Sequence, residues 1–171
     1  MGVLDDLGGI LKQYSGAAAT ANPGPAVAEH FDQVSSAVPA STLAEGVTHA
    51  LSSSTGAGGL GQTLSKSYTQ ATGDQKAGIL NTLVASVGAT TAGRFLGSSA
   101  TQALNSGSPL SAQHAQQISP SAVQQLADQA AQNDNSVVNR LGALYAQHPT
   151  LVKGLGASAM ALVMSRLANR R

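Results

Sequence analysis

Apolar residues along this 171-residue chain recur every three or four positions, which is the spacing of one face of an α-helix. Few stretches alternate strictly between apolar and polar side chains, as a half-buried strand would, and those stretches are short. Glycine and proline residues interrupt the periodic segments, so each helix is limited to a few turns. The sequence therefore predicts an all-α fold of seven to eight short helices.

Polar residues at the ends of the periodic segments indicate where several helices begin. The spacing of Thr42 and Glu45 is that of a capping box, and Asp74 is placed to cap the helix that carries Ile79. We expect that helix to continue past its glycines to residue 104. Ser111 and the pair Ser119-Pro120 are further start signals. Pro149 is expected to open the last helix, which carries apolar residues as far as residue 164.

Two segments of the chain resemble each other. Residues 28–35 (AEHFDQVS) match residues 112–119 (AQHAQQIS), and each is followed by a proline and then by Leu-Ala-Glu or Leu-Ala-Asp. Such an echo suggests two related helical halves, divided near residues 105–109. We therefore expect an N-terminal helical region over residues 1–107 and a C-terminal one over residues 108–171, which could pack as one domain.

The composition excludes several classes of site. The chain has no cysteine, which rules out disulfides, thiolate zinc sites, iron–sulfur clusters and a cysteine nucleophile. Charged residues make up only 10% and aromatic residues 3% of the chain. A surface with so few charges is largely neutral, and neutral surfaces favour association. The composition thus favours a protein that contacts copies of itself.

The formal net charge is +1, but the charges are distributed unevenly. Residues 1–74 are acidic on balance, whereas residues 135–171 contain five bases and no acid. Arg166, Arg170 and Arg171 are candidate anion contacts, and they give an alternative function as a nucleic-acid-binding helical module. These arginines are also suited to the negative C-terminal end of a helix dipole, which needs no ligand.

The remaining motifs give little evidence of a cofactor, metal or catalytic site. Residues 56–61 (GAGGLG) match the Gly-x-Gly-x-x-Gly pattern, but the dinucleotide loop needs a preceding strand, and here a helix is expected. The histidines have no partner three or four positions away, so nothing in their spacing predicts a metal site. They are His30, His49, His114 and His148. We therefore expect no cofactor, no metal and no enzymatic activity.

Some segments resemble the YidB-like family of bacterial proteins. The opening MGVLDDL, the segment 119–129 and above all residues 145–153 (YAQHPTLVK) carry the likeness. It extends best over residues 108–171 and more loosely over 28–84. The resemblance implies a small, homeodomain-like arrangement of helices. Because the family has no assigned activity, it implies no catalytic residue.

We expect the last helix to be the principal association or core element. Apolar residues surround most of it, and a helix of that kind must be covered by more than one neighbour. The candidate face consists of Leu155, Ala159, Leu162 and Val163. The N-terminus is acidic, unlike a signal peptide, and the longest apolar run is too short to span a membrane. We expect a cytoplasmic, non-enzymatic structural protein that forms a homo-oligomer or filament.

Overall fold

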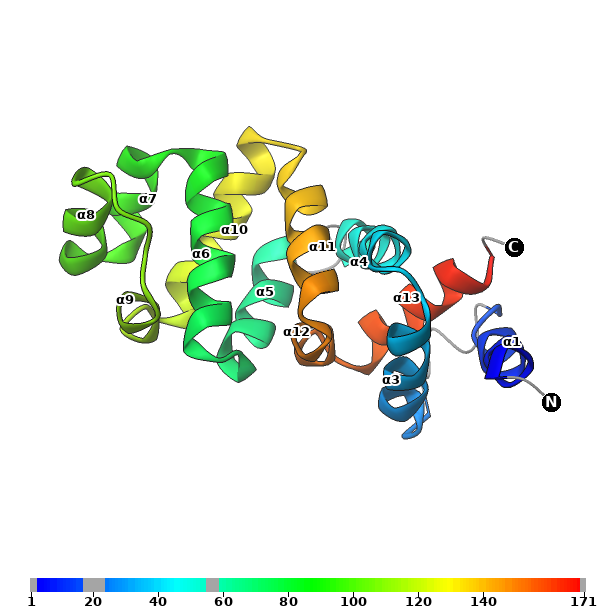
Figure 1. The fold of residues 1–171 in the computed structure, drawn as a ribbon. Helices are drawn as coiled ribbons and strands as arrows, with labels where there is room; N and C mark the ends of the chain where they lie inside the picture. Colours follow the sequence, from blue (N-terminus) through cyan, green and yellow to red (C-terminus); the bar gives the residue numbers. More distant parts are fainter. Residues whose placement is uncertain (1–2, 17–23, 55–58, 170–171) are drawn as a thin grey trace.

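The computed structural model describes residues 3–16, 24–54 and 59–169, and every regular element in these ranges is an α-helix (Figure 1). The all-α prediction is therefore confirmed. The described helices are α1 (Val3–Gln13), α3 (Val27–Ala37), α4 (Ala40–Ser54), α5 (Gly59–Gln70), α6 (Gly73–Val87), α7 (Ala89–Leu96), α8 (Ser98–Asn105), α9 (Ala112–Gln116), α10 (Pro120–Asn133), α11 (Val137–Gln147), α12 (Pro149–Gly154) and α13 (Ala157–Ala168).

The expected number of seven to eight helices is wrong, since the described ranges contain twelve. Glycines with positive φ account for much of the difference. Gly88 (φ +85°) and Gly97 (φ +81°) divide the segment expected to be one helix into α6, α7 and α8, and Gly156 (φ +98°) separates α12 from α13. Residues with a side chain rarely adopt these backbone angles, whereas glycine does so at little cost.

The helix starts were predicted with mixed success. Ser119 and Pro120 open α10 as expected, and Ser111 caps α9. The other two signals are wrong. α4 begins at Ala40, so Thr42 lies inside the helix, and α6 is capped by Thr72, whose side chain accepts from the backbone N–H of Gln75. A threonine two residues earlier therefore replaces Asp74 as the cap.

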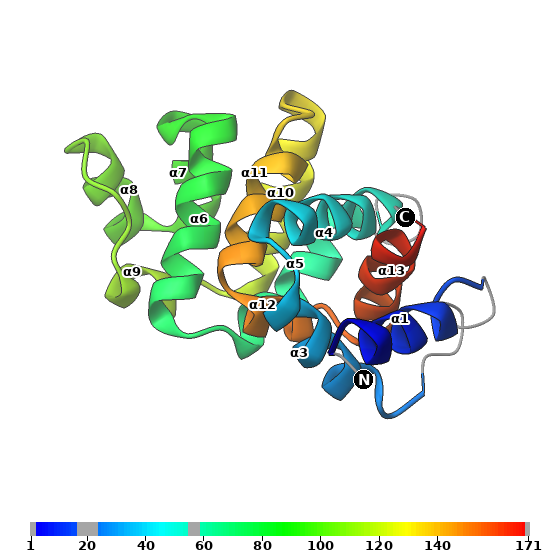
Figure 2. The ribbon, with the colours of Figure 1, turned by 45° about the vertical axis from the view of Figure 1, so that its right-hand side comes forward.

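Helices of each predicted region pack on helices of the other region. α4 packs on α11 and α13, while α10 packs on α5 and α6. In the same way α3 packs on α13, and α9 packs on α6. As a result α1, α3, α4 and α13 lie together at one end of the molecule, and α6 to α10 lie at the other, with α11 and α12 between them (Figures 1 and 2). The contacts of α3 and α4 thus correspond to those of α9 and α10, as two related halves would require.

Individual residues follow the same correspondence. A Cβ built on Gly154 of α12 would meet the Cα of Ser67 on α5 at 3.0 Å, and one built on Gly78 of α6 would meet Leu144 Cδ1 of α11 at 3.2 Å. Each contact thus joins a glycine to the residue that precedes a buried tyrosine. The two tyrosines, Tyr68 and Tyr145, lie near the C-terminal ends of α5 and α11.

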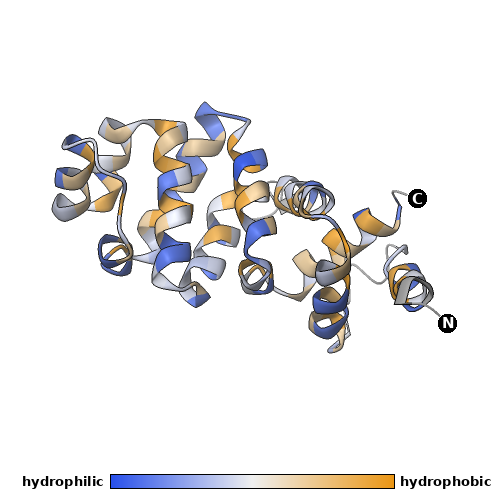
Figure 3. Ribbon diagram, in the orientation of Figure 1, coloured by the Kyte–Doolittle hydropathy of each residue, from blue (hydrophilic) through white to orange (hydrophobic). Residues whose placement is uncertain are grey.

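The core follows these crossings through the length of the molecule. Apolar residues from all the described helices form one continuous buried cluster. Hydrophobic and hydrophilic residues occur on the same helices throughout, so that each helix keeps one face for packing (Figure 3). No helix in the described ranges combines the length and apolar character that a bilayer crossing would need.

Two glycines allow the closest helix crossings. A Cβ on Gly61 of α5 would overlap the carbonyl oxygen of Gln124 on α10, and a Cβ on Gly142 of α11 would overlap Thr48 on α4. The backbone N–H of Gly61 also donates to Asp128 Oδ1 at 3.0 Å. At both crossings the absence of a side chain lets the two helix backbones approach each other.

We expect Gly61→Ala to lower the free energy of unfolding by about 1–3 kcal/mol, because the new methyl group must displace the backbone of α10. Gly9→Ala is the matched control, since its Cβ would meet no atom within 4 Å. That control should be neutral or stabilising by up to about 1 kcal/mol through helix propensity. Urea unfolding of both variants measures the difference. Equal stability of the two would contradict the close crossing.

Candidate functional site

The structure assigns the four residues of the predicted association face to different environments. Val163 is fully buried, with its Cγ1 only 3.0 Å from the position of a Cβ on Gly46 of α4. It therefore belongs to the core of the chain. Leu155 and Ala159 are 8% and 7% exposed, and Leu162 is half-buried. Most of the predicted face is thus covered by the chain's own helices, and Leu162 remains the most accessible of the four.

Three of these residues line a hollow between α5, α12 and α13. Its volume is about 420 Å³. The residues that line it are Thr63, Lys66, Gln70, Gly154, Leu155, Gly156, Ala157, Ser158, Ala159 and Leu162. Small residues make up much of its wall, Leu155 and Leu162 are its large apolar groups, and Lys66 is its charged group. A hollow of this composition can receive an apolar side chain from another molecule.

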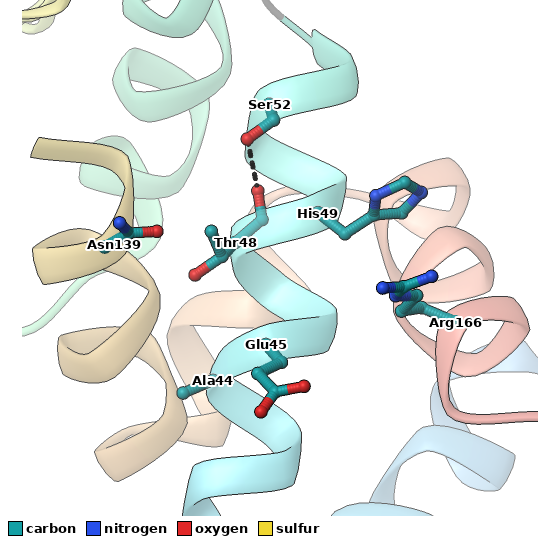
Figure 4. Close-up of a pocket in the computed structure, with 7 residues that line it drawn as sticks. All are labelled: Ala44, Glu45, Thr48, His49, Ser52, Asn139 and Arg166. Carbon is teal, nitrogen blue, oxygen red and sulfur yellow. Dashed lines mark hydrogen bonds between the residues drawn. The ribbon is translucent and has the colours of Figure 1, made fainter. Parts of the chain in front are cut away.

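A second groove, lined mainly by residues with polar or charged side chains and called the polar groove below, lies between α4, α11 and α13 (Figure 4). Its volume is about 490 Å³. Ala44, Glu45, Thr48, His49 and Ser52 of α4 line it together with Asn139 of α11 and Arg166 of α13. The His49 ring and the Arg166 guanidinium both extend into the space between α4 and α13, and the Glu45 carboxylate lies one turn below His49. The groove thus contains hydrogen-bond donors of two types, an imidazole and a guanidinium, beside a carboxylate.

Arg166 is the predicted anion contact that the structure describes, since Arg170 and Arg171 lie outside the described residues. Its side chain is exposed at the edge of the groove, and no ion pair joins it to another described residue. The groove itself was missed from the sequence. The spacing of Glu45, Thr48 and Ser52 on one face of a helix signals part of it, but Asn139 and Arg166 reach it only through the fold.

The glycine-rich motif does not have the context of a dinucleotide loop. Residues 56–58 lie outside the described residues, and the motif follows α4, which is a helix. Gly59 (φ +77°) is the first residue of α5, and Gly61 is one of the crossing glycines. The described part of the motif therefore serves helix packing.

The four histidines lie at separate places. His30 Nδ1 pairs with the hydroxyl of Tyr14 at 2.9 Å, and His114 completes the capping box of α9. His148 lies between α11 and α12, and His49 lines the polar groove. Within the described ranges, no three histidine or acidic side chains converge as a metal site would need.

Two buried tyrosines and a buried serine form a polar group that the sequence reasoning missed. The Tyr68 hydroxyl donates to the carbonyl oxygen of Ala115, and the Ser67 hydroxyl donates to that of Leu151 at 3.0 Å. The Tyr145 hydroxyl has no hydrogen-bond partner among the described residues. Burial raises the pKa of Tyr145, and the neighbouring Ser67 hydroxyl lowers it by a smaller amount. Both tyrosines are therefore neutral at physiological pH.

We expect the two tyrosines to respond in opposite ways to removal of the hydroxyl. Tyr68→Phe should lower the free energy of unfolding by about 1 kcal/mol, since it deletes a buried hydrogen bond. Tyr145→Phe should leave it unchanged or raise it by up to about 1 kcal/mol, because it removes an unpaired polar atom. Parallel urea titrations measure both variants. A larger loss at Tyr145 than at Tyr68 would show that the Tyr145 hydroxyl is paired in solution.

Comparison of the chain with models of protein families, with curated proteins and with solved structures found no match. The resemblance to the YidB-like family and the homeodomain-like arrangement stay predictions. The function must accordingly follow from the hollow, the groove and the surface of the chain itself.

Proposed function

We propose that the protein is a non-enzymatic structural protein that associates with copies of itself through the hollow between α5, α12 and α13. One observation carries this proposal. Leu155, Ala159 and Leu162, which the sequence singled out as an association face, line that one hollow. Leu162 is only half-buried there, so its covering by a neighbouring molecule would remove further apolar surface from water.

The surface around the hollow supports the same proposal. Glycine, alanine and serine in its wall let the backbone of a partner approach closely, and Lys66 is the charged residue among those that line it. Only 17 of the 171 residues carry a formal charge, so little electrostatic repulsion opposes contact between copies. Assembly by this route would depend little on ion pairs and would persist at high salt.

Leu162→Glu tests the hollow as an interface. We expect this variant to keep its helical fold and to weaken self-association at least tenfold, because assembly would then bury an unpaired carboxylate. Val87→Glu, a change at a half-buried position on α6, is the matched control and should associate as the unaltered protein does. Sedimentation velocity over a range of concentrations measures the assembly, and circular dichroism checks the fold. A monomeric unaltered protein at high concentration would overturn the proposal.

An alternative function, as a nucleic-acid-binding module, is favoured by the polar groove. Arg166 and His49 both extend into the space between α4 and α13 there, and a phosphate between them would accept from both. Glu45 lines the same groove and would repel that phosphate. The sequence isoelectric point of about 8.1 is also low for a domain that binds nucleic acid. We therefore rank this function second.

If the groove does bind phosphates, Arg166→Gln should weaken binding to every duplex sequence and reduce the slope of log affinity against log salt by about one. Arg94→Gln, a change at an exposed arginine of α7, serves as the control and should alter binding less. Fluorescence anisotropy with two unrelated duplexes measures both. We expect no sequence-specific retention at physiological salt, and a tight, salt-resistant complex with one duplex would reverse the ranking.

A further inference from the structure

The polar groove carries charged side chains of both signs. The His49 ring and the Arg166 guanidinium extend into the space between α4 and α13, and the Glu45 carboxylate lies one turn below His49 (Figure 4). Residues four positions apart on a helix have their Cβ atoms about 5–6 Å apart, so the carboxylate and the imidazole are within reach of one small molecule. Arg166 is exposed, and no ion pair joins it to another described residue.

The side of the groove toward α11 carries uncharged polar groups. The Thr48 hydroxyl lies against Gly142 of α11, where it would overlap a Cβ built on that glycine. Asn139, three residues earlier on α11, is exposed and lines the same groove. Hydroxyl and amide groups both donate and accept hydrogen bonds. Charged and neutral polar groups thus surround one space of about 490 Å³, a volume in the range of small-molecule sites.

The mixture of charges discriminates between classes of ligand. An anion such as phosphate would accept from Arg166 and His49 but would be repelled by Glu45, and a simple cation would be repelled by Arg166. A zwitterion avoids both conflicts, because its carboxylate can accept from the two donors while its ammonium donates to Glu45. Histidine donates an N–H in either protonation state, and a carboxylate has about four acceptor positions. Glu45 can therefore hold an ammonium in addition to a contact within its own chain.

We propose that the polar groove binds a free amino acid with an uncharged polar side chain. Such a molecule carries its ammonium and its carboxylate on one carbon, which suits an acid and donors about one helical turn apart. Its side chain can then pair with the Thr48 hydroxyl and the Asn139 amide. Because the charged groups of the groove are exposed to water, we expect a dissociation constant on the order of millimolar. Among the described residues the groove and the hollow share none, so this site is independent of the proposed self-association.

Titration of the isotope-labelled full chain with glutamine, followed by NMR, tests the site. We expect saturable shifts of the Asn139 side-chain amide signals. N-acetylglutamine lacks the ammonium and glutamine methyl ester lacks the carboxylate, so each should bind about two- to fivefold more weakly, as the loss of one exposed ion pair predicts. Equal binding of the three compounds, or no saturable shift at tens of millimolar glutamine, would overturn the inference and leave self-association through the hollow standing.

Two variants assign the charges. Glu45→Gln should abolish the preference for glutamine over N-acetylglutamine, and Arg166→Gln should abolish the preference for glutamine over its methyl ester. Glu29→Gln and Arg94→Gln, at exposed positions of α3 and α7, are the matched controls and should keep both preferences. Groove variants that behave as these controls do would contradict the assignment. Tighter binding of inorganic phosphate than of glutamine would also overturn it and would favour the nucleic-acid alternative. Circular dichroism checks that each variant keeps the fold.

Discussion

Close approach of helix backbones at glycine is the constraint on which the rest of this structure depends. The α5–α10 crossing at Gly61 and the α4–α11 crossing at Gly142 join the two halves of the chain, and a methyl group at either position would overlap the facing helix. With few aromatic residues, the chain has few large side chains to fill wider gaps between helices. Small residues at the crossings let Leu, Val and Ala form a continuous core instead.

The periodicity of the sequence was enough to predict helices, but it could not locate their ends. Serine caps at residues 111 and 119 were recognisable because the side chain that caps is next to the helix it starts. Gly88, Gly97 and Gly156 could equally have lain inside helices, since glycine in a helix costs only about 1 kcal/mol. Whether such a glycine breaks the helix depends on what the following segment packs against, and that information is tertiary.

The hollow and the groove also differ in whether their residues are neighbours in the sequence or are brought together only by tertiary packing. The hollow was partly predictable, because Leu155, Ala159 and Leu162 belong to one segment with small residues between them. The polar groove combines side chains of three helices, and the presence of both His49 and Arg166 in it depends on how α4 and α13 pack. Val163 shows the limit of interpreting a single helix: the sequence placed it on a candidate association face, yet α4 of the same chain covers it at Gly46.

Helices of the two halves pack on one another, and this determines which helix can separate from the fold most easily. α4 contacts two helices of the other half and α10 contacts three, so displacing either would open the core. Among the described side chains, α1 contributes two buried ones at the edge of the molecule, Leu7 and Leu11, and Tyr14 follows them; none of these takes part in the crossings at Gly61 and Gly142. An element with few packing contacts at the edge of a fold opens at a lower free energy than the core does. Among the described helices α1 packs on α13 and α3 at the edge, so local opening of this fold is expected there before it reaches the crossings of the core.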